Sequence, residues 1–371
     1  MNRLGREVKG IRRVFCEESR TVLRPFAGPA RAPICKAMTP QELLHPRPEG
    51  LYCPLGDFHV DPVSPVARAL ITHGHADHAR AGHGAVLATR RTLDIMRLRY
   101  GDGFAKSAEA ADGPLEVNGV AVSFHPAGHV LGSAQIRLAA RGASVVVTGD
   151  YKRGSDPTAE PYEPVAGDVL ITEATFGLPV FRHPDPRAEI AKLLRSLEDF
   201  PDRAHLIGVY ALGKAQRVIR LIRDAGYDAP IYIHGALKAL CDYYQAEGID
   251  LGRLEPATIQ NGDKARFAGQ IVLAPPSAFG AKWAQRFAEP LIGFASGWMQ
   301  VRARARQRGV ELPLVISDHC DWAELTQTIT ELAPGEVWVT HGREEALVRW
   351  CELNQIRAKP LNIVGYEDEA E

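Results

Sequence analysis

The chain has 371 residues, of which 45% are hydrophobic and 24% are charged. These proportions are typical of a folded globular protein and exclude a disordered or fibrous chain. The length exceeds one ordinary hydrophobic core, so it predicts two domains or one large elaborated domain. No run of about 18 apolar residues occurs, so we expect no transmembrane helix and no membrane partner.

The net charge of −1 hides an uneven distribution along the chain. Residues 178–310 carry 19 Lys and Arg against 13 Asp and Glu, whereas residues 311–371 carry 4 against 13. A basic central segment therefore lies between two acidic ones. The six cysteines are scattered without a C-x-x-C pair. This argues against a thiolate zinc site and a disulfide scaffold, and it predicts a cytoplasmic location.

The N-terminal segment differs from the rest of the chain. Residues 1–37 are rich in arginine and lack a clear hydrophobic period, whereas "MTPQELL", from Met38, starts like an ordinary protein. The segment fits a flexible basic arm, an untranslated extension before a true start at Met38, or an amphipathic targeting peptide. We favour the start at Met38 and expect residues 1–37 to be untranslated or disordered.

From residue 56 onward, short strands deliver polar residues at their carboxyl ends. "GDFHVDPV" predicts a strand that reaches Asp61, and "ARALITHGH" predicts a buried strand that runs into a polar loop. "VAVSFHPAGHV", "ASVVVTGD" and "GDVLITEATFG" follow the same pattern, the last at Glu173. Strand ends of this kind present ligands at a shared sheet edge.

The residue pattern changes in the middle of the chain. Residues 187–200 have helical spacing, and "HLIGVYALGKAQRVIRLIRDAGYDAPIYIHG" predicts a strand, a helix and a strand of a parallel α/β unit. "GQIVLAPPSA" and "PLIGFASGWM" predict further strands, after which "LPLVISDHCDW" and "GEVWVTHGREEALVRWCEL" return to the first style. We therefore expect a ligand-bearing domain, residues 38–177 and 313–371, interrupted by an inserted α/β domain, residues 178–312.

A metal-binding pattern follows the second of these strands. His73, His75, Asp77 and His78 form H-x-H-x-D-H. Alternate residues point the same way, so the first two histidines can face one metal and the other pair can turn toward a second. Imidazole and carboxylate suit Zn²⁺ or Mn²⁺, and the lack of thiolates is typical of catalytic sites. A solvated histidine-rich loop is the alternative that this spacing disfavours. Three later strand ends supply further ligands: His129, Asp150 and His341.

Several motifs resemble a known family. The order H-x-H-x-D-H, then histidine, then aspartate resembles the metallo-β-lactamase fold, a four-layer αββα sandwich with a dinuclear site. "ITEATFG", "ALGKAQR", "FASGWM", "ISDHCDW" and "VTHGRE" resemble its β-CASP branch of nucleic-acid nucleases. From about Met38 to the C-terminus, the ligase-associated DNA exonucleases are the most similar group. The resemblance implies an inserted β-CASP α/β domain and a DNA exonuclease that acts in repair beside an ATP-dependent DNA ligase and a helicase.

The resemblance also implies roles for the ligands. Asp150 would bridge two divalent metal ions, with Zn²⁺ expected and Mn²⁺ as the alternative. Asp61 would support the ligand loop from behind, with Asp57 as a rival for that role. One metal would be held by His73, His75 and His129, and the other by Asp77, His78 and His341.

Two further residues match motifs that flank the insert. By the resemblance, Glu173 would orient and charge His319, and His319 would protonate the departing oxygen. The two cations would activate water for in-line attack at phosphorus and neutralise the phosphodiester.

Other residues have both a structural and a functional interpretation. Lys214, at a predicted helix N-terminus, and Ser296, in a tight turn, are candidates for contact with substrate phosphate; the alternatives are a solvated lysine and a plain turn. Trp298 could stack on a base or fill the core. The arginines of "RARARQR", residues 302–308, could bind a nucleic-acid backbone or coat a solvated helix. Three more histidines are expected to be loop or structural residues rather than ligands: His83, His125 and His234.

DNA is the expected substrate, and an RNA-processing nuclease of the same branch is the first alternative. His341 favours the alternative, because RNA-cleaving members carry histidine there, whereas eukaryotic DNA-processing members carry valine. A small-ester or thioester hydrolase of the same fold is the second alternative, which the basic insert and the Glu173–His319 pair disfavour. A non-catalytic scaffold is a third class, disfavoured because every ligand position is filled.

Overall fold

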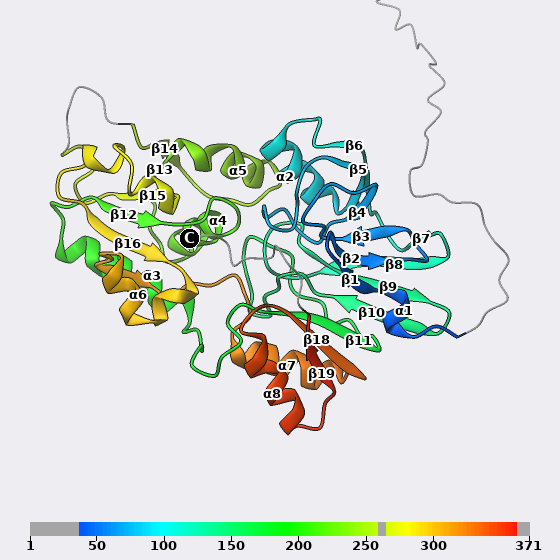
Figure 1. The fold of residues 1–371 in the computed structure, drawn as a ribbon. Coiled ribbons are helices and arrows are strands. Elements are labelled where there is room, and N and C mark those ends of the chain that lie inside the picture. The colour runs from blue at the N-terminus through cyan, green and yellow to red at the C-terminus, as the bar shows by residue number, and fades with distance from the viewer. Residues whose placement is uncertain (1–36, 259–264, 362–371) are drawn as a thin grey trace, which may run out of the picture.

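The computed structural model describes residues 37–258 and 265–361 and forms a mixed α/β fold with three sheets (Figure 1). The basic arm expected at residues 1–37 lies outside the described residues except for its last position. The acidic tail "GYEDEAE" also lies outside them. No helix in the described ranges is long and apolar enough to cross a membrane.

The first sheet is built from the N-terminal part of the chain, in sequence order. Its first two pairings are antiparallel and the remaining three are parallel. The short helix α1 (Pro40–Leu43) precedes it and begins with a Thr39 capping box. The strands are β1 (His45–Arg47), β2 (Gly50–Cys53), β3 (Phe58–Val60), β4 (Arg68–Leu70), β5 (His83–Ala88) and β6 (Ala105–Ala110).

The second sheet joins distant parts of the chain. Its order is β19-β18-β11-β10-β9-β8-β7, antiparallel from β7 to β10 and parallel from β10 to β19. Strands β11 and β18 are therefore neighbours although the third sheet lies between them in sequence. The strands are β7 (Leu115–Val117), β8 (Val120–Pro126), β9 (Ala134–Ala140), β10 (Ala143–Val147), β11 (Val169–Ala174), β18 (Glu336–Gly342) and β19 (Ala358–Pro360).

The first two sheets share one hydrophobic core, and helices cover their other faces. Along β10, Val145 and Val147 face the shared core, whereas Val146 faces the opposite side, as the two-residue period of a strand requires. Helices α7 (Trp322–Leu332) and α8 (Glu344–Leu353) pack on that opposite side. Helix α2 (Arg90–Tyr100) packs through Leu93 and Met96 on the outer face of the first sheet.

The third sheet has six parallel strands in the order β14-β13-β15-β12-β16-β17. The strands are β12 (His205–Gly208), β13 (Ile231–Ile233), β14 (Leu254–Pro256), β15 (Ile271–Ala274), β16 (Leu291–Ala295) and β17 (Leu312–Leu314). The helices of this region are α3 (Pro186–Asp199), α4 (Lys214–Asp224), α5 (Gly235–Ala246) and α6 (Arg302–Gln307), with the 3₁₀ turns η1 (Pro276–Ala278), η2 (Ala284–Arg286) and η3 (Gly297–Gln300).

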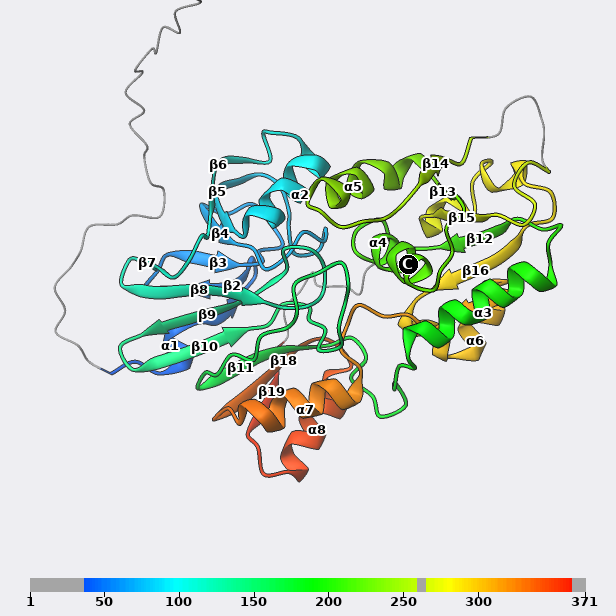
Figure 2. The ribbon, with the colours of Figure 1, turned by 180° about the vertical axis from the view of Figure 1, so that it is seen from behind.

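Helices α3, α4 and α5 cover one face of the third sheet with apolar residues at helical spacing. In α3 these are Ile190, Leu193, Leu194 and Leu197, one stripe that joins the sheet core. Two residues from the first part of the chain, Ile95 of α2 and Leu131, pack into the same core. The three sheets therefore form one continuous body, with the third sheet beside the other two, as the view from behind also shows (Figure 2).

Candidate metal centre

Four residues gather at the carboxyl ends of strands in the first two sheets. His73 and His75 follow β4, His129 lies in the turn between β8 and β9, and Asp150 follows β10. Their ligand atoms all lie within 4.8 Å of one another, and all four side chains are buried. Nδ1 of His75 lies 3.1 Å from Nε2 of His73 and 3.0 Å from Nε2 of His129. Three imidazole nitrogens therefore converge on one point.

A second group lies beside the first. Ligand atoms of Asp77, His78 and His341 also lie within 4.8 Å of one another. The rings of His78 and His341 stack with centroids 5.0 Å apart and an interplanar angle of 15°. His341 comes from β18, so residues near both ends of the described chain complete the group. Its φ of +59° is unusual for a residue with a side chain, and such backbone strain is typical of functional positions.

Asp150 connects the two groups. Its Oδ2 atom lies 3.4 Å from Nε2 of His73 and 3.7 Å from Nε2 of His129, in the first group. The same oxygen lies 3.5 Å from Nε2 of His78, in the second group. A single carboxylate oxygen thus faces ligands of both groups.

The buried donors fit cations. The Oδ1 atoms of Asp77 and Asp150 are buried, and neither has a hydrogen-bond partner in the described part of the chain. Burial, opposed by the charges of His78 and His319, raises the pKa of Asp150 to about 8. Burial and neighbouring imidazoles lower the pKa of His73 and His129 well below the usual value, which keeps their nitrogens available to a metal. Oxygen and imidazole donors without thiolate suit Zn²⁺ or Mn²⁺.

Asp61 holds the ligand loop in place. It follows β3 with a φ of +43° and accepts hydrogen bonds from the backbone N–H of Thr72 at 2.7 Å and from its hydroxyl at 2.6 Å. Its Oδ2 atom also lies 2.8 Å from Nδ1 of His78. The rival Asp57 instead pairs with Arg68 at 2.9 Å on the surface. The geometry therefore favours Asp61 for the supporting role.

The chain passes very close to this loop at Gly149. Its φ is +56°, and a Cβ atom there would lie 2.7 Å from Oγ1 and 2.8 Å from Cβ of Thr72. The glycine lets the end of β10 approach the ligand loop, which brings Asp150 to the histidines.

Glu173 and His319 form a close pair, and their ligand atoms lie within 4.8 Å of an oxygen of Asp150. Oε2 of Glu173 lies 3.0 Å from Nδ1 of His319, and Oε1 accepts a hydrogen bond from the backbone N–H of Tyr151 at 2.9 Å. Burial would lower the pKa of His319, but the carboxylates of Glu173 and Asp150 outweigh it and raise the pKa to about 10. The pair has the contact that the sequence predicted, and its catalytic role stays a prediction.

Asp318 is a residue that the sequence interpretation missed. Its backbone carbonyl lies 2.9 Å from Nδ1 of His129, and its carboxylate accepts a bond from the Lys214 ammonium at 2.5 Å. Burial alone would raise the pKa of Asp318, but that ammonium holds it well below the usual range. The feature of the sequence that could have identified Asp318 is its position next to His319, in a short polar segment after a strand. The backbone carbonyl of Leu212, 3.3 Å from Nε2 of His75, carried no signal in the sequence.

A cleft opens between this centre and the third sheet. It is lined by Asp77, Asp150, Thr175, Phe176, Tyr210, Lys214, Ser296, Gly297, Trp298, Ser317, Asp318, His319 and His341. Lys214 is only 2% exposed, and its charge is matched by Asp318. Ser296 caps η3 by accepting from the N–H of Trp298. Contact of Lys214 or Ser296 with substrate phosphate stays a prediction.

The three histidines that were expected to be loop or structural residues lie outside the two ligand groups. His83 begins β5 rather than lying in a loop, and its Nδ1 accepts a hydrogen bond from Val66 N–H at 3.2 Å. His125 lies 2.9 Å from Glu163, and His234 caps helix α5. Each therefore has a structural contact of its own.

Comparison with known proteins gives relatives of two kinds. About 85% of the chain is 27% identical to a probable DNA ligase from Opitutus terrae, and the chain spans 32% of that protein. An endoribonuclease ysh1 from Aspergillus fumigatus is 30% identical over 54% of the chain, which spans 27% of that protein. The chain is a homologue of the metallo-β-lactamase β-CASP nucleases. The resemblance expected from the motifs is confirmed.

The comparisons with family models and with solved structures are less specific. No protein-family model matches the chain. A solved structure of a protein of unknown function from Enterococcus faecalis superposes with a TM-score of 0.51 and 14% identity over 78% of both chains, which shows a shared fold alone. The chain spans about a quarter to a third of the length of the first relatives that it matches.

Proposed function

We propose that the protein is a DNA exonuclease that hydrolyses phosphodiester bonds with two divalent metal ions, Zn²⁺ before Mn²⁺. The observation that carries the proposal is the place of Asp150 between two groups of ligands. His73, His75 and His129 would hold one ion, Asp77, His78 and His341 the other, and Asp150 both. When bound, such ions supply activated water and neutralise the charge of a phosphodiester.

The chain's own residues supply the rest of the chemistry. Nδ1 of His319 is engaged by Glu173, so the ring presents Nε2 to the cleft that it lines. Nε2 would donate a proton to the departing oxygen, and Glu173 would fix the ring orientation and stabilise its charged form. Asp61 would keep His78 turned toward the second ion.

The proposal extends to architecture and setting. We infer that the helix-covered sheet pair is the four-layer αββα sandwich, formed by residues 38–177 and 313–371, with residues 178–312 as the inserted β-CASP domain. Strand β17, Leu312–Leu314, crosses the expected boundary by two residues. A cytoplasmic location fits the four described cysteines, which are all free thiols.

DNA is preferred because a relative that matches over 340 residues is a probable DNA ligase. The proposed setting is DNA end processing and repair beside an ATP-dependent ligase and a helicase. RNA cleavage is the second candidate, since the ysh1 relative is an endoribonuclease and position 341 is histidine.

The deciding experiment compares end-labelled DNA and RNA strands of the same sequence. The purified protein is stripped of metal and then supplied with Zn²⁺ or Mn²⁺. We expect cleavage that depends on added metal, stepwise removal from one DNA end, and slower cleavage of RNA. Faster cleavage of RNA would replace the first proposal with the second, and metal-independent cleavage would contradict both.

A further inference from the structure

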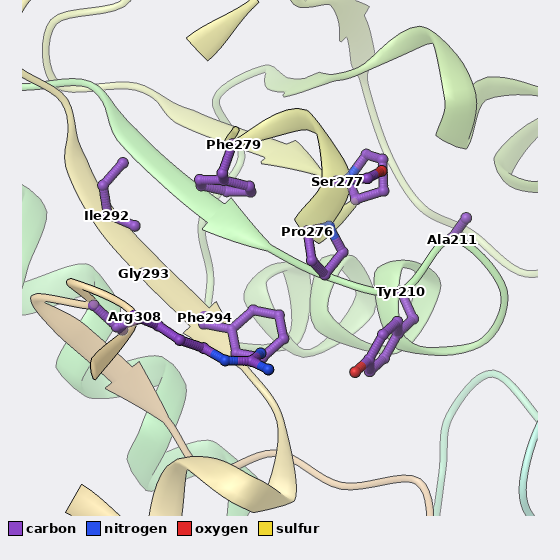
Figure 3. A pocket seen from close by; sticks show the side chains of 11 residues that line it. Tyr210, Ala211, Pro276, Ser277, Phe279, Ile292, Gly293, Phe294 and Arg308 are labelled. Carbon is purple, nitrogen blue, oxygen red and sulfur yellow. The ribbon is translucent and has the colours of Figure 1, made fainter. Parts of the chain in front are cut away.

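A second cavity opens at the carboxyl edge of the third sheet (Figure 3). Its volume is about 550 Å³, within the usual range of small-molecule sites. Chain segments after β12 and β15, strand β16 and the segment before β17 line it. Its lining is mainly apolar and aromatic, with one cationic side chain, and includes Tyr210, Pro276, Phe279, Ile292, Phe294 and Arg308.

The topology makes this edge a natural binding position. From β12 the chain continues to β13, toward the β14 edge of the sheet. From β16 it continues to β17, at the opposite edge. The carboxyl ends of β12 and β16 are therefore neighbours whose connections run in opposite directions. In parallel α/β sheets, ligands bind outside the strand ends at such a point.

The cavity shares a lining residue with the cleft at the proposed metal centre. Tyr210 lines both this cavity and the cleft that contains Asp150 and His319. Along β16, Phe294 lines the cavity, and Ser296, two residues later, lines the cleft. In an extended strand, residues two positions apart are separated by ~6.6 Å along the strand, a distance that one nucleotide can span.

The lining fits a planar, aromatic ligand attached to an anion. The rings of Tyr210 and Phe294 lie 6.2 Å apart at an angle of 74°. The guanidinium carbon of Arg308 lies 5.8 Å from the Phe294 centroid, and Figure 3 shows this group alongside the ring. Aromatic side chains stack on bases of any sequence, and an arginine beside them can contact base or phosphate.

We propose that this cavity binds a nucleobase of the substrate strand, close to the phosphodiester that is cleaved. The proposal rests on the proposed nuclease function and adds a base-binding subsite to it. The metal centre would recognise the phosphate, and the cavity would fix which nucleotide beside it is engaged. Since stacking does not read sequence, the subsite would require a base without selecting one.

The test uses oligonucleotides in which one position at a time lacks its base. In the unaltered protein, one position near the cleaved bond should raise KM by about 5- to 150-fold when it is abasic. Phe279→Leu removes a ring from the cavity wall, and Ser277→Trp fills the cavity; neither residue lines the cleft at the metal centre. Both variants should cleave intact strands with a raised KM, and the penalty of the abasic position should fall below about 2-fold, with kcat and metal dependence retained.

Matched variants control for surface changes. Phe200→Leu removes an exposed ring that precedes β12, and Arg349→Gln removes an exposed arginine of α8 outside the cavity; both should keep the full abasic penalty. Arg308→Gln should raise KM on intact strands where Arg349→Gln does not. Metal-dependent cleavage without any position-specific penalty in the unaltered protein would overturn the base subsite and leave the nuclease proposal standing. Cleavage of no oligonucleotide would overturn the nuclease proposal itself.

Discussion

Oδ2 of Asp61 lies 2.8 Å from Nδ1 of His78, which turns Nε2 of His78 to within 3.5 Å of Asp150. Asp61 is 3% exposed and also accepts a hydrogen bond from the backbone N–H of Thr72, the residue before the first histidine of the pattern. One buried carboxylate thus orients the loop that carries four proposed ligands. Partners of metal-bound histidines commonly contribute about 10–100-fold to metal affinity.

We therefore expect Asp61→Ala to lower metal affinity by about 10–100-fold. Metal content after dialysis against a competing chelator measures the effect, and circular dichroism checks the fold. Asp57→Ala is the control, because Asp57 is exposed and pairs with Arg68 away from the loop. Equal metal loss in both variants would remove the special role of Asp61.

The Glu173–His319 pair predicts a substrate-dependent loss of rate. His319→Gln should lower kcat on DNA by about 10²–10⁴-fold, because the departing oxygen loses its proton donor. An aryl phosphodiester with a nitrophenolate leaving group needs no such proton, so its hydrolysis should fall far less. Glu173→Gln should follow the same pattern, with metal content kept.

His125→Gln is the matched control, since His125 also pairs with a glutamate but lies on β8 outside the ligand groups. It should leave both rates unchanged. A loss of equal size on DNA and on the aryl diester would show that His319 acts otherwise than as a proton donor.

Burial should decide how much two ion pairs of equal length stabilise the protein. Lys214–Asp318 and Lys238–Asp242 both measure 2.5 Å, but the lysine side chains are 2% and 63% exposed. Lys214→Met should lower the free energy of unfolding by about 3–5 kcal/mol, because it leaves a buried carboxylate without its partner. Lys238→Met should change it by about 0.5 kcal/mol or less. Urea denaturation measures both, and similar losses would contradict the prediction.

Two glycines with positive φ allow the cost of backbone strain to be distinguished from the cost of a steric clash. At Gly142, φ is +84° and an added Cβ would meet nothing within 4 Å, whereas at Gly149 it would collide with Thr72. Gly142→Ala should cost about 1–2 kcal/mol of stability from backbone strain. Gly149→Ala should cost at least about 1 kcal/mol more and also lower metal content, because the ligand loop must move. Equal unfolding energies and normal metal content in the two variants would refute this.

Much of the site was accessible from the sequence because its residues end strands. His73, Asp150 and Glu173 each stand in or just after an apolar, β-branched run, and such runs converge at a sheet edge. The strands and helices of "HLIGVYALGKAQRVIRLIRDAGYDAPIYIHG" and of "GEVWVTHGREEALVRWCEL" are confirmed for the same reason, since their apolar periods are clear.

Other features carried no local signal. Strand β6, "AKSAEA", lacks β-branched residues and forms because β5 offers it a parallel edge. The pairing of Lys214 with Asp318 joins residues far apart in sequence, so a lysine expected at a helix start proved to be buried. The aromatic cavity at the third sheet assembles from four separate segments, none of which is distinctive alone.

The parallel pairing of β11 with β18 has a consequence for synthesis on the ribosome. About 160 residues separate the two strands, which at ~5–20 residues per second takes ~8–32 s to translate. During that interval the nascent chain already carries every proposed ligand except His341, but the sheet edge that receives β18 is open. The second ligand group closes only when β18 docks. The proposed metal centre is therefore complete only after translation has passed His341, and a product that ends before this residue would lack the second ligand group.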